Sequence, residues 1–127
     1  MRLLTAALLA VSLLSVAVGQ KKPPDVRILE TKAARDGANI SVDGKVKVTS
    51  EKPLKGLVIV FDFRSPEKEV VTSQKTVVGE GTLESGHEGV YHAEMVDAVR
   101  AVNYTIRAFD AHEKELRVAN PGPFVVE

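Results

Sequence analysis

The side chains best suited to metal binding or acid–base chemistry are three histidines, His87, His92 and His112, in a chain that has no cysteine. Two histidine ligands on one element normally stand four residues apart on a helix or two apart on a strand, where both share a face. No pair of these histidines has either spacing. The pattern therefore predicts scattered surface histidines and no metal site. The absence of cysteine excludes disulfides, cysteine-based zinc sites, thiol catalysis and a cysteine-linked lipid anchor.

Other motifs resemble fragments of catalytic or cofactor sites without completing one. Gly79-Glu80-Gly81 lacks the third glycine and the following helix of a dinucleotide site, so it predicts a bend. Ser85-Gly86-His87 is not part of a Gly-x-Ser-x-Gly elbow and predicts a loop. Four glutamates stand close to lysines, which is typical of solvated hairpin tips: Glu67, Glu69, Glu113 and Glu115. The sequence thus predicts no catalytic, cofactor-binding or metal-binding residue, and a protein that is not an enzyme and needs no cofactor.

The charge balance bears on the class of partner. The 127 residues include 17 basic and 17 acidic side chains. No net positive field attracts a nucleic-acid backbone, and no stripe of Lys and Arg replaces it. We therefore expect a protein partner and no nucleic acid.

The first residues have the pattern of an export signal. An apolar run from Leu3 to Val18 follows Arg2, and Ala17-Val18-Gly19 places small residues where a signal peptidase cuts. The run of about 16 residues is shorter than the roughly 20 that an uncleaved membrane anchor needs. We expect residues 1–19 to be a cleaved signal peptide, with no membrane insertion after cleavage. Residues 20–25 then form a polar leader with two prolines, and residues 26–127 form one domain that is periplasmic or secreted.

The elements that position these side chains are predicted to be strands, because hydrophobicity alternates with a period of two along most of the chain. Apolar and polar residues alternate over 40–49, 91–95 and 102–108, whereas segment 57–63 is apolar on nearly both faces. Only segment 95–101 fits a helical turn.

Turn motifs separate these strands. Asp36-Gly37 predicts a tight hairpin between strands at 26–35 and 38–49. Ser65-Pro66-Glu67-Lys68 predicts a type I turn before a strand that runs to Val78, and a similar Glu-Lys pair after Phe109-Asp110 predicts a second hairpin of the same type. Asn120-Pro-Gly-Pro123 separates a strand at 116–119 from a last short strand at 124–126. Seven or eight short strands with a turn about every ten residues indicate an all-β, antiparallel β-sandwich.

Several of these segments carry a family resemblance. The segments are 42–46 (Val-Asp-Gly-Lys-Val), 55–65, 69–71 and 83–93, and together they lie within 40–118. They resemble the FxLYD family of exported bacterial domains, with Phe61 at the start of the Phe-x-Leu-Tyr-Asp signature and Phe63, Arg64 and Ser65 in place of its last three residues. The resemblance implies an immunoglobulin-like fold and an extracytoplasmic structural or binding module, and it implies no catalytic residues.

The aromatic residues of this strand predict a core rather than a ligand platform. Phe61 and Phe63 share a strand face with Leu57 and Ile59, and a sandwich buries such a face between its sheets. A sugar-binding platform would favour exposed Trp or Tyr. We therefore expect a non-enzymatic exported module that contacts proteins through strand edges and loop tips, as an adaptor or envelope-associated protein. The alternative is a small secreted inhibitor or ligand-binding protein that uses the loops at one end of the sandwich.

Overall fold

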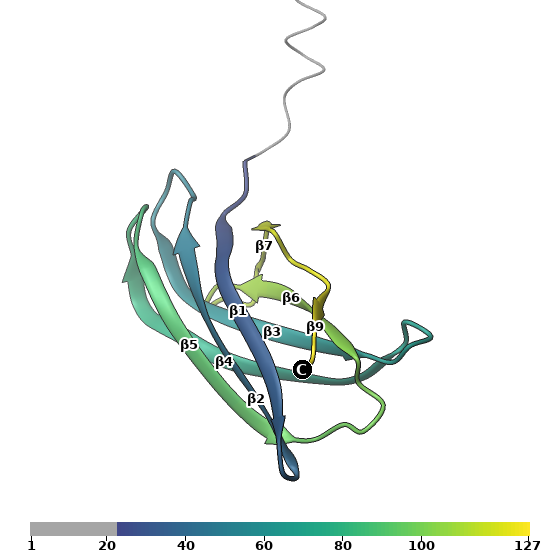
Figure 1. Ribbon diagram of the computed structural model, residues 1–127. Coiled ribbons are helices and arrows are strands. Elements are labelled where there is room, and N and C mark those ends of the chain that lie inside the picture. The colour runs from purple at the N-terminus through teal and green to yellow at the C-terminus, as the bar shows by residue number, and fades with distance from the viewer. Residues whose placement is uncertain (1–22) are drawn as a thin grey trace, which may run out of the picture.

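The computed structural model describes residues 23–127, and these residues form an all-β sandwich of two sheets (Figure 1). The expected signal peptide at 1–19 lies outside the described residues. One sheet has the strand order β5-β2-β1-β8, and the other has the order β4-β3-β6-β7, with β9 also paired to β6. The strands are β1 (Val26–Asp36), β2 (Asn39–Val48), β3 (Leu54–Arg64), β4 (Val70–Leu83), β5 (Glu88–Val96), β6 (Asn103–Phe109), β7 (Glu115–Leu116), β8 (Val118–Ala119) and β9 (Phe124–Val125). The predicted all-β sandwich is confirmed.

The first sheet is built on the predicted hairpin of β1 and β2. The strands pair from Val26 with Val48 to Asp36 with Asn39, so the two turn residues are 37 and 38, one residue later than predicted. Gly37 has a φ of 64°, which glycine adopts without strain at the first central position of a type II′ turn. β5 pairs along the other edge of β2.

The segment 95–101, where the sequence allows a helical turn, is the end of β5 followed by a tight turn. Met95 is buried as part of β5, and the N–H of Ala101 donates to the carbonyl oxygen of Ala98. The pairing of Met95 with Ile40 continues the ladder to this point. Sheet pairing therefore determines the conformation at the start of this segment.

The core lies between the two sheets, and β3 is its central strand. Leu57, Ile59, Phe61 and Phe63 are at most 1% exposed, which confirms that this face of β3 is core. Alternate residues of the neighbouring and facing strands complete it: Val26, Ile28, Ala33, Ile40, Val42, Val46, Val48, Tyr91, Met95, Tyr104, Ile106, Ala108 and Leu116.

Two tyrosine hydroxyls end inside this core, and each has a partner. A bulge in β1 turns Thr31 inward, where its hydroxyl lies 2.8 Å from that of Tyr104. The Tyr91 hydroxyl donates to the carbonyl oxygen of Glu30 at 3.2 Å, and burial raises the pKa of Tyr91 to about 12. Gly44 makes room for Tyr91, because a Cβ at this position would lie 2.2 Å from the hydroxyl oxygen. Close packing thus requires glycine here.

The segment Gly79-Glu80-Gly81 is not the bend that the sequence predicts. It lies inside β4, which runs unbroken from Val70 to Leu83 against β3. Two register shifts in β3, on either side of Leu57, absorb the irregularity, and Gly56 and Gly81 both have a φ of 79°. Glycine on both strands therefore forms a bulged continuation of the ladder instead of ending it.

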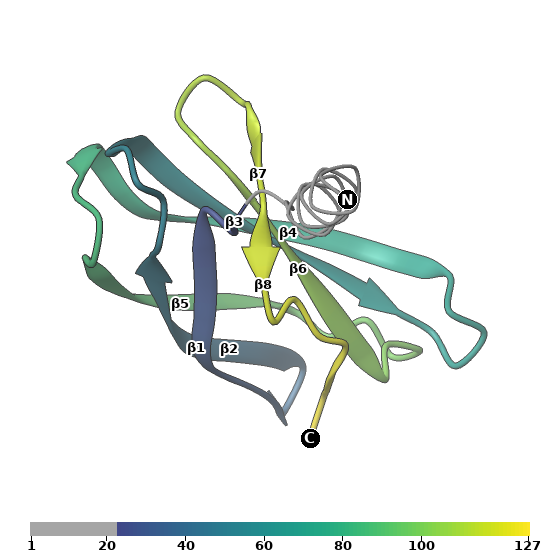
Figure 2. The same cartoon turned by 90° about the horizontal axis from the view of Figure 1, so that it is seen from above.

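The C-terminal segment joins the two sheets along one side of the sandwich (Figure 2). β7 and β9 pair with β6, whereas β8 pairs in parallel with the start of β1. Arg117 determines the crossing point: its N–H donates to the Asp25 carboxylate, and its carbonyl oxygen accepts the N–H groups of Asp25 and Val26. The predicted strand at 116–119 is therefore split, and the described residues contain nine strands rather than seven or eight.

The β3–β4 and β6–β7 connections have the same geometry, as the sequence predicts. In the first, the N–H of Ser65 donates to the carbonyl oxygen of Glu69, and in the second the N–H of Asp110 donates to that of Lys114. Lys68 and Glu113 occupy equivalent positions, with φ values of 70° and 64°. Ser65 and Asp110 also use their side chains to accept backbone N–H groups of their own loops.

Candidate interaction surface

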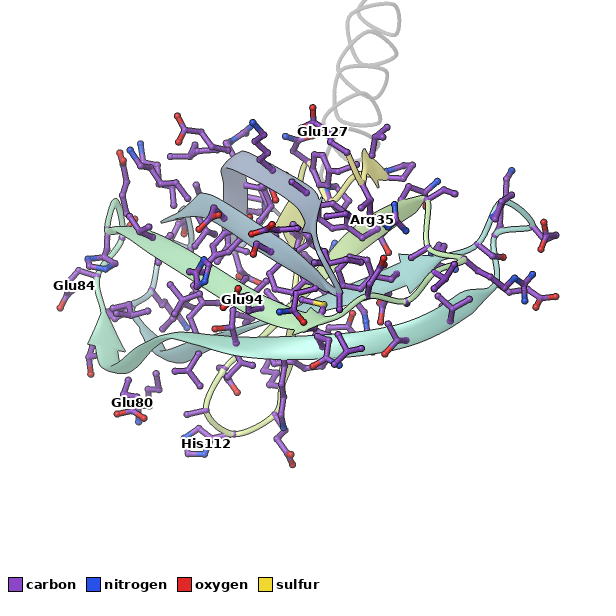
Figure 3. The ribbon with its side chains drawn as sticks, turned by 60° about the horizontal axis from the view of Figure 1, so that its bottom comes forward. Arg35, Glu80, Glu84, Glu94, His112 and Glu127 are labelled. Atoms are coloured by element: carbon purple, nitrogen blue, oxygen red, sulfur yellow. The ribbon has the colours of Figure 1, made fainter. Side chains whose placement is uncertain are left out.

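The three histidines lie on separate parts of the surface. His87 follows the turn after β4, and His92 lies on the outer face of β5. His112 is at the tip of the β6–β7 hairpin (Figure 3). His92 is paired with Asp43 across the β2–β5 ladder, with 2.6 Å between Nδ1 and the carboxylate oxygen. This hydrogen bond and the charge of Asp43 raise the pKa of His92 above 6.5. The placement of all three follows the sequence prediction.

Residues 23–127 lack two further kinds of functional feature. No group of three or more His, Asp or Glu side chains in this part of the chain is placed to hold a metal ion. No helix among the described residues is long and apolar enough to cross a membrane. The glutamates of the two hairpins belong to different ends of the sheet, and Glu67 pairs with Arg100.

The outer face of the β4-β3-β6 sheet carries a polar cluster that sequence reasoning missed. Asp62 is only 5% exposed, although inward and outward side chains alternate along β3 and Asp62 is at an outward position. Its carboxylate accepts hydrogen bonds from Arg107 at 2.6 and 3.0 Å and from the Ser73 hydroxyl at 2.6 Å. Burial alone would raise the pKa of Asp62, but these hydrogen bonds and the charge of Arg107 outweigh it, and the pKa lies below 3.8.

This cluster borders an open cavity of about 400 Å³. Val58 and Val60 form its floor, and the β6–β7 hairpin forms one wall, which is held over β3 by a hydrogen bond from the Ala111 N–H to the Lys55 carbonyl oxygen. The Arg107 guanidinium lies 5.5 Å from the centre of the Phe109 ring. The outer face of this sheet is thus apolar in its middle and charged at its border.

The longest element, β4, is also an edge strand. It pairs with β3 on one side and ends the strand order of its sheet on the other. In Figure 3 it runs along one border of the molecule, from the β3–β4 hairpin to the arrowhead near Glu80 and Glu84. Most of its residues are exposed or half-buried. Because its 14 residues include five valines and threonines in its first eight positions and no proline, it has the composition of a strand that pairs readily.

The hydrogen bonds of β6 show which way the backbone groups of the sheet point. The N–H of Ile106 donates to the carbonyl oxygen of Pro121, on the side of β6 away from β3. Backbone groups of successive residues alternate in direction along a strand. The backbone N–H and C=O groups of Arg107 therefore point towards β3, and those of its partner Val60 point towards β6.

The same alternation carries across β3 to β4. The backbone groups of residues 59, 61 and 63 of β3 point towards β4, where these residues pair with 76, 74 and 72. The intervening residues Ser73, Lys75 and Val77 consequently direct their N–H and C=O groups away from the sheet. These groups are the unpaired edge of the sandwich.

The opposite strand on this side, β5, leaves the edge of β4 unpaired. The two strands end different sheets and share no ladder. β5 nevertheless lies beside part of β4, where the Thr76 hydroxyl donates to the carbonyl oxygen of His92 at 3.4 Å. The C-terminal segment joins the two sheets by backbone pairing on one side of the sandwich, whereas on the other side no backbone hydrogen bond joins β4 to β5 within residues 23–127.

Comparison with known proteins bears on the fold. No protein-family model and no curated protein matches the chain. Among solved structures, it is similar to Bacteroides uniformis beta-glucuronidase (12% identity, TM-score 0.51) and to a calcium-binding mutant of Bacteroides uniformis beta-glucuronidase 2 (13% identity, TM-score 0.53). These matches cover 73% and 75% of this chain, which spans only 13% and 14% of the glucuronidase chains. A match to IrmA from Escherichia coli has 12% identity and a TM-score of 0.52, and covers 80% of this chain and 95% of that chain. At these identities the likeness shows the fold alone.

Proposed function

We propose that the protein is a non-enzymatic, exported module that contacts other proteins by adding an extended segment to the free edge of β4. The observation that carries this proposal is the outward direction of the backbone groups of Ser73, Lys75 and Val77. Each outward residue offers one backbone donor and one backbone acceptor, and an added strand can hydrogen-bond to both. The side chains of the added strand then contact the two faces of the sheet and provide specificity. An unpaired edge of this length is the feature that strand addition requires.

The export signal and the family resemblance support the same proposal. A module of the FxLYD type has an immunoglobulin-like sandwich and works outside the cytoplasm. The strand order supports that fold. β3, β6 and the C-terminal strands correspond to the three-stranded sheet of an immunoglobulin domain, and β4 corresponds to an additional strand at the edge of that sheet. The likeness to IrmA shows that a sandwich of this architecture can make up nearly a whole chain.

A matched pair of substitutions at Lys75 tests the edge. Lys75→Pro removes an outward N–H and blocks an incoming strand, but it breaks no bond to β3. Lys75→Ala removes the same side chain and keeps the N–H. Both variants are expressed as the full chain, recovered from the extracytoplasmic fraction and used to capture partners from that fraction.

The proposal predicts that the wild type and Lys75→Ala capture the same protein and that Lys75→Pro captures at least about tenfold less, as expected when a backbone contact is lost. Equal capture by both variants would place the contact elsewhere. Thermal unfolding of each variant shows whether Lys75→Pro remains folded, and Ser73→Pro is not used because Ser73 bonds to Asp62.

A second candidate function, the binding of a small ligand by the loops at one end, is favoured by two cavities there. They measure about 310 and 340 Å³ and share Asp25, Ser50 and Lys52 among their lining residues. The β2–β3 loop and the β6–β7 hairpin meet at this end. Ligand binding at this end would raise the melting temperature of the wild type but not of a Lys52→Glu variant, because the added carboxylate changes the charge of both cavities.

A further inference from the structure

The first nine of the 14 residues of β4 read nearly the same in both directions. Its first nine residues are Val-Val-Thr-Ser-Gln-Lys-Thr-Val-Val, with Gln74 in the middle. Two antiparallel strands related by a two-fold axis place each residue opposite its mirror position in the sequence. We infer that β4 pairs with β4 of a second copy of this chain, with Gln74 on the two-fold axis. This inference rests on the proposed function and names the partner at the same edge.

The side chains match in this register. Thr72 faces the second copy's Thr76, and Ser73 faces the second copy's Lys75, while valines face valines at both ends. Cross-strand pairs of threonines and of β-branched residues stabilise antiparallel strands, whereas like charges directly opposite destabilise them. The single lysine of the nine residues therefore has no lysine opposite it.

The backbone groups select the same register. Outward groups belong to odd-numbered positions 73, 75 and 77, so an added copy can bond only if odd positions face odd positions. A two-fold axis on Gln74 meets this condition, because 73 then faces 75. A two-fold axis on Lys75 also meets this condition, but it places the two copies of Lys75 directly opposite each other. An axis between two neighbouring residues places odd positions opposite even ones and leaves the outward backbone groups without partners.

Cysteine cross-linking tests this register directly, because the chain has no cysteine of its own. Gln74 is not among the outward positions, so the two copies of Gln74 form a non-hydrogen-bonded pair, with Cα atoms about 4.5 Å apart, close enough for a disulfide. Gln74→Cys is therefore predicted to yield an intermolecular disulfide under mild oxidation. Lys75→Cys tests the competing register, and Val90→Cys, at an exposed position of β5, reports random collisions.

The expected result is at least about tenfold more cross-linked dimer for Gln74→Cys than for Lys75→Cys or Val90→Cys. Sedimentation of the wild-type chain should show a concentration-dependent dimer that Lys75→Pro abolishes. Cross-linking of Gln74→Cys at the collision rate, or a wild-type chain that is monomeric at all concentrations, would overturn the inference. If such a monomer still captures a different protein that Lys75→Pro loses, self-pairing fails while strand addition stands. If Lys75→Pro changes neither result, both proposals fail.

Discussion

Replacing Phe61 by alanine tests the position of β3 at the centre of the core. The ring is fully buried and lies 5.6 Å from Tyr91, 6.1 Å from Tyr104 and 6.5 Å from Phe63, measured between ring centres. Emptying a buried Phe site costs about 3 to 5 kcal/mol, and each aromatic contact adds about 0.5 to 1.5 kcal/mol to what area alone predicts. With three aromatic neighbours we expect a loss of about 4 to 5 kcal/mol in the free energy of unfolding.

Urea unfolding followed by circular dichroism measures this loss. A domain of this size has a total stability of about 5 to 15 kcal/mol, so Phe61→Ala should unfold at a much lower urea concentration or remain largely unfolded. Phe61→Leu keeps most of the volume and should cost about 1 to 2 kcal/mol, which preserves a measurable transition. A loss below about 1 kcal/mol for Phe61→Ala would refute the core position.

Phe109→Ala is the matched control, because it removes the same side chain from the outer face of the sheet. Phe109 is only half-buried, and the Arg107 guanidinium lies over its ring. We expect a loss of about 1 kcal/mol. Equal losses at Phe61 and Phe109 would show that the two faces of this sheet are equally packed, contrary to the structure.

Three further predictions concern other sites. Gly44→Ala should lower the free energy of unfolding by about 2 kcal/mol or more, because the new methyl group would meet both the Tyr91 hydroxyl and the backbone oxygen of Glu30; urea unfolding measures this, and an unchanged midpoint would contradict it. The pKa of Asp62 is lowered in the folded state, so its contribution to stability is present above the unfolded-state pKa of about 3.9 and is lost as the pH falls through the folded-state pKa. Asp62→Asn should therefore flatten the decline of stability below about pH 4, and an identical acid profile for the two proteins would be against this. We predict from the signal pattern that the mature protein begins at Gln20, and an intact mass that includes residues 1–19 would disprove cleavage after Gly19.

The sequence predicts the alternating strands because each has one buried face and a matching two-residue period. The inward residues of β3 and β6 could be assigned in this way, and Phe61 and Tyr104 are indeed buried. The hairpins were predictable because Gly37, Lys68 and Glu113 lie in short loops with recognisable turn chemistry.

Features that depend on distant partners were not predictable from local sequence. Asp62 occupies an outward position and is buried only because Ser73 and Arg107 arrive from β4 and β6. Gly81 suggests a break, yet the strand continues because β3 has its own glycine bulge opposite. The split at Arg117 depends on Asp25, 92 residues away. In each case the register between strands, which one strand's sequence does not contain, determines the result.

Residue-resolved hydrogen exchange of the β4 amides tests the central claim most directly. In dilute protein, the amides of Thr72, Gln74 and Thr76 should be protected by β3, whereas those of Ser73, Lys75 and Val77 should exchange rapidly. When the edge is occupied, by a second copy at high concentration or by a captured partner, the outward amides should also become protected. Exchange at these three amides that stays equally rapid in the free and bound protein would contradict strand addition at β4.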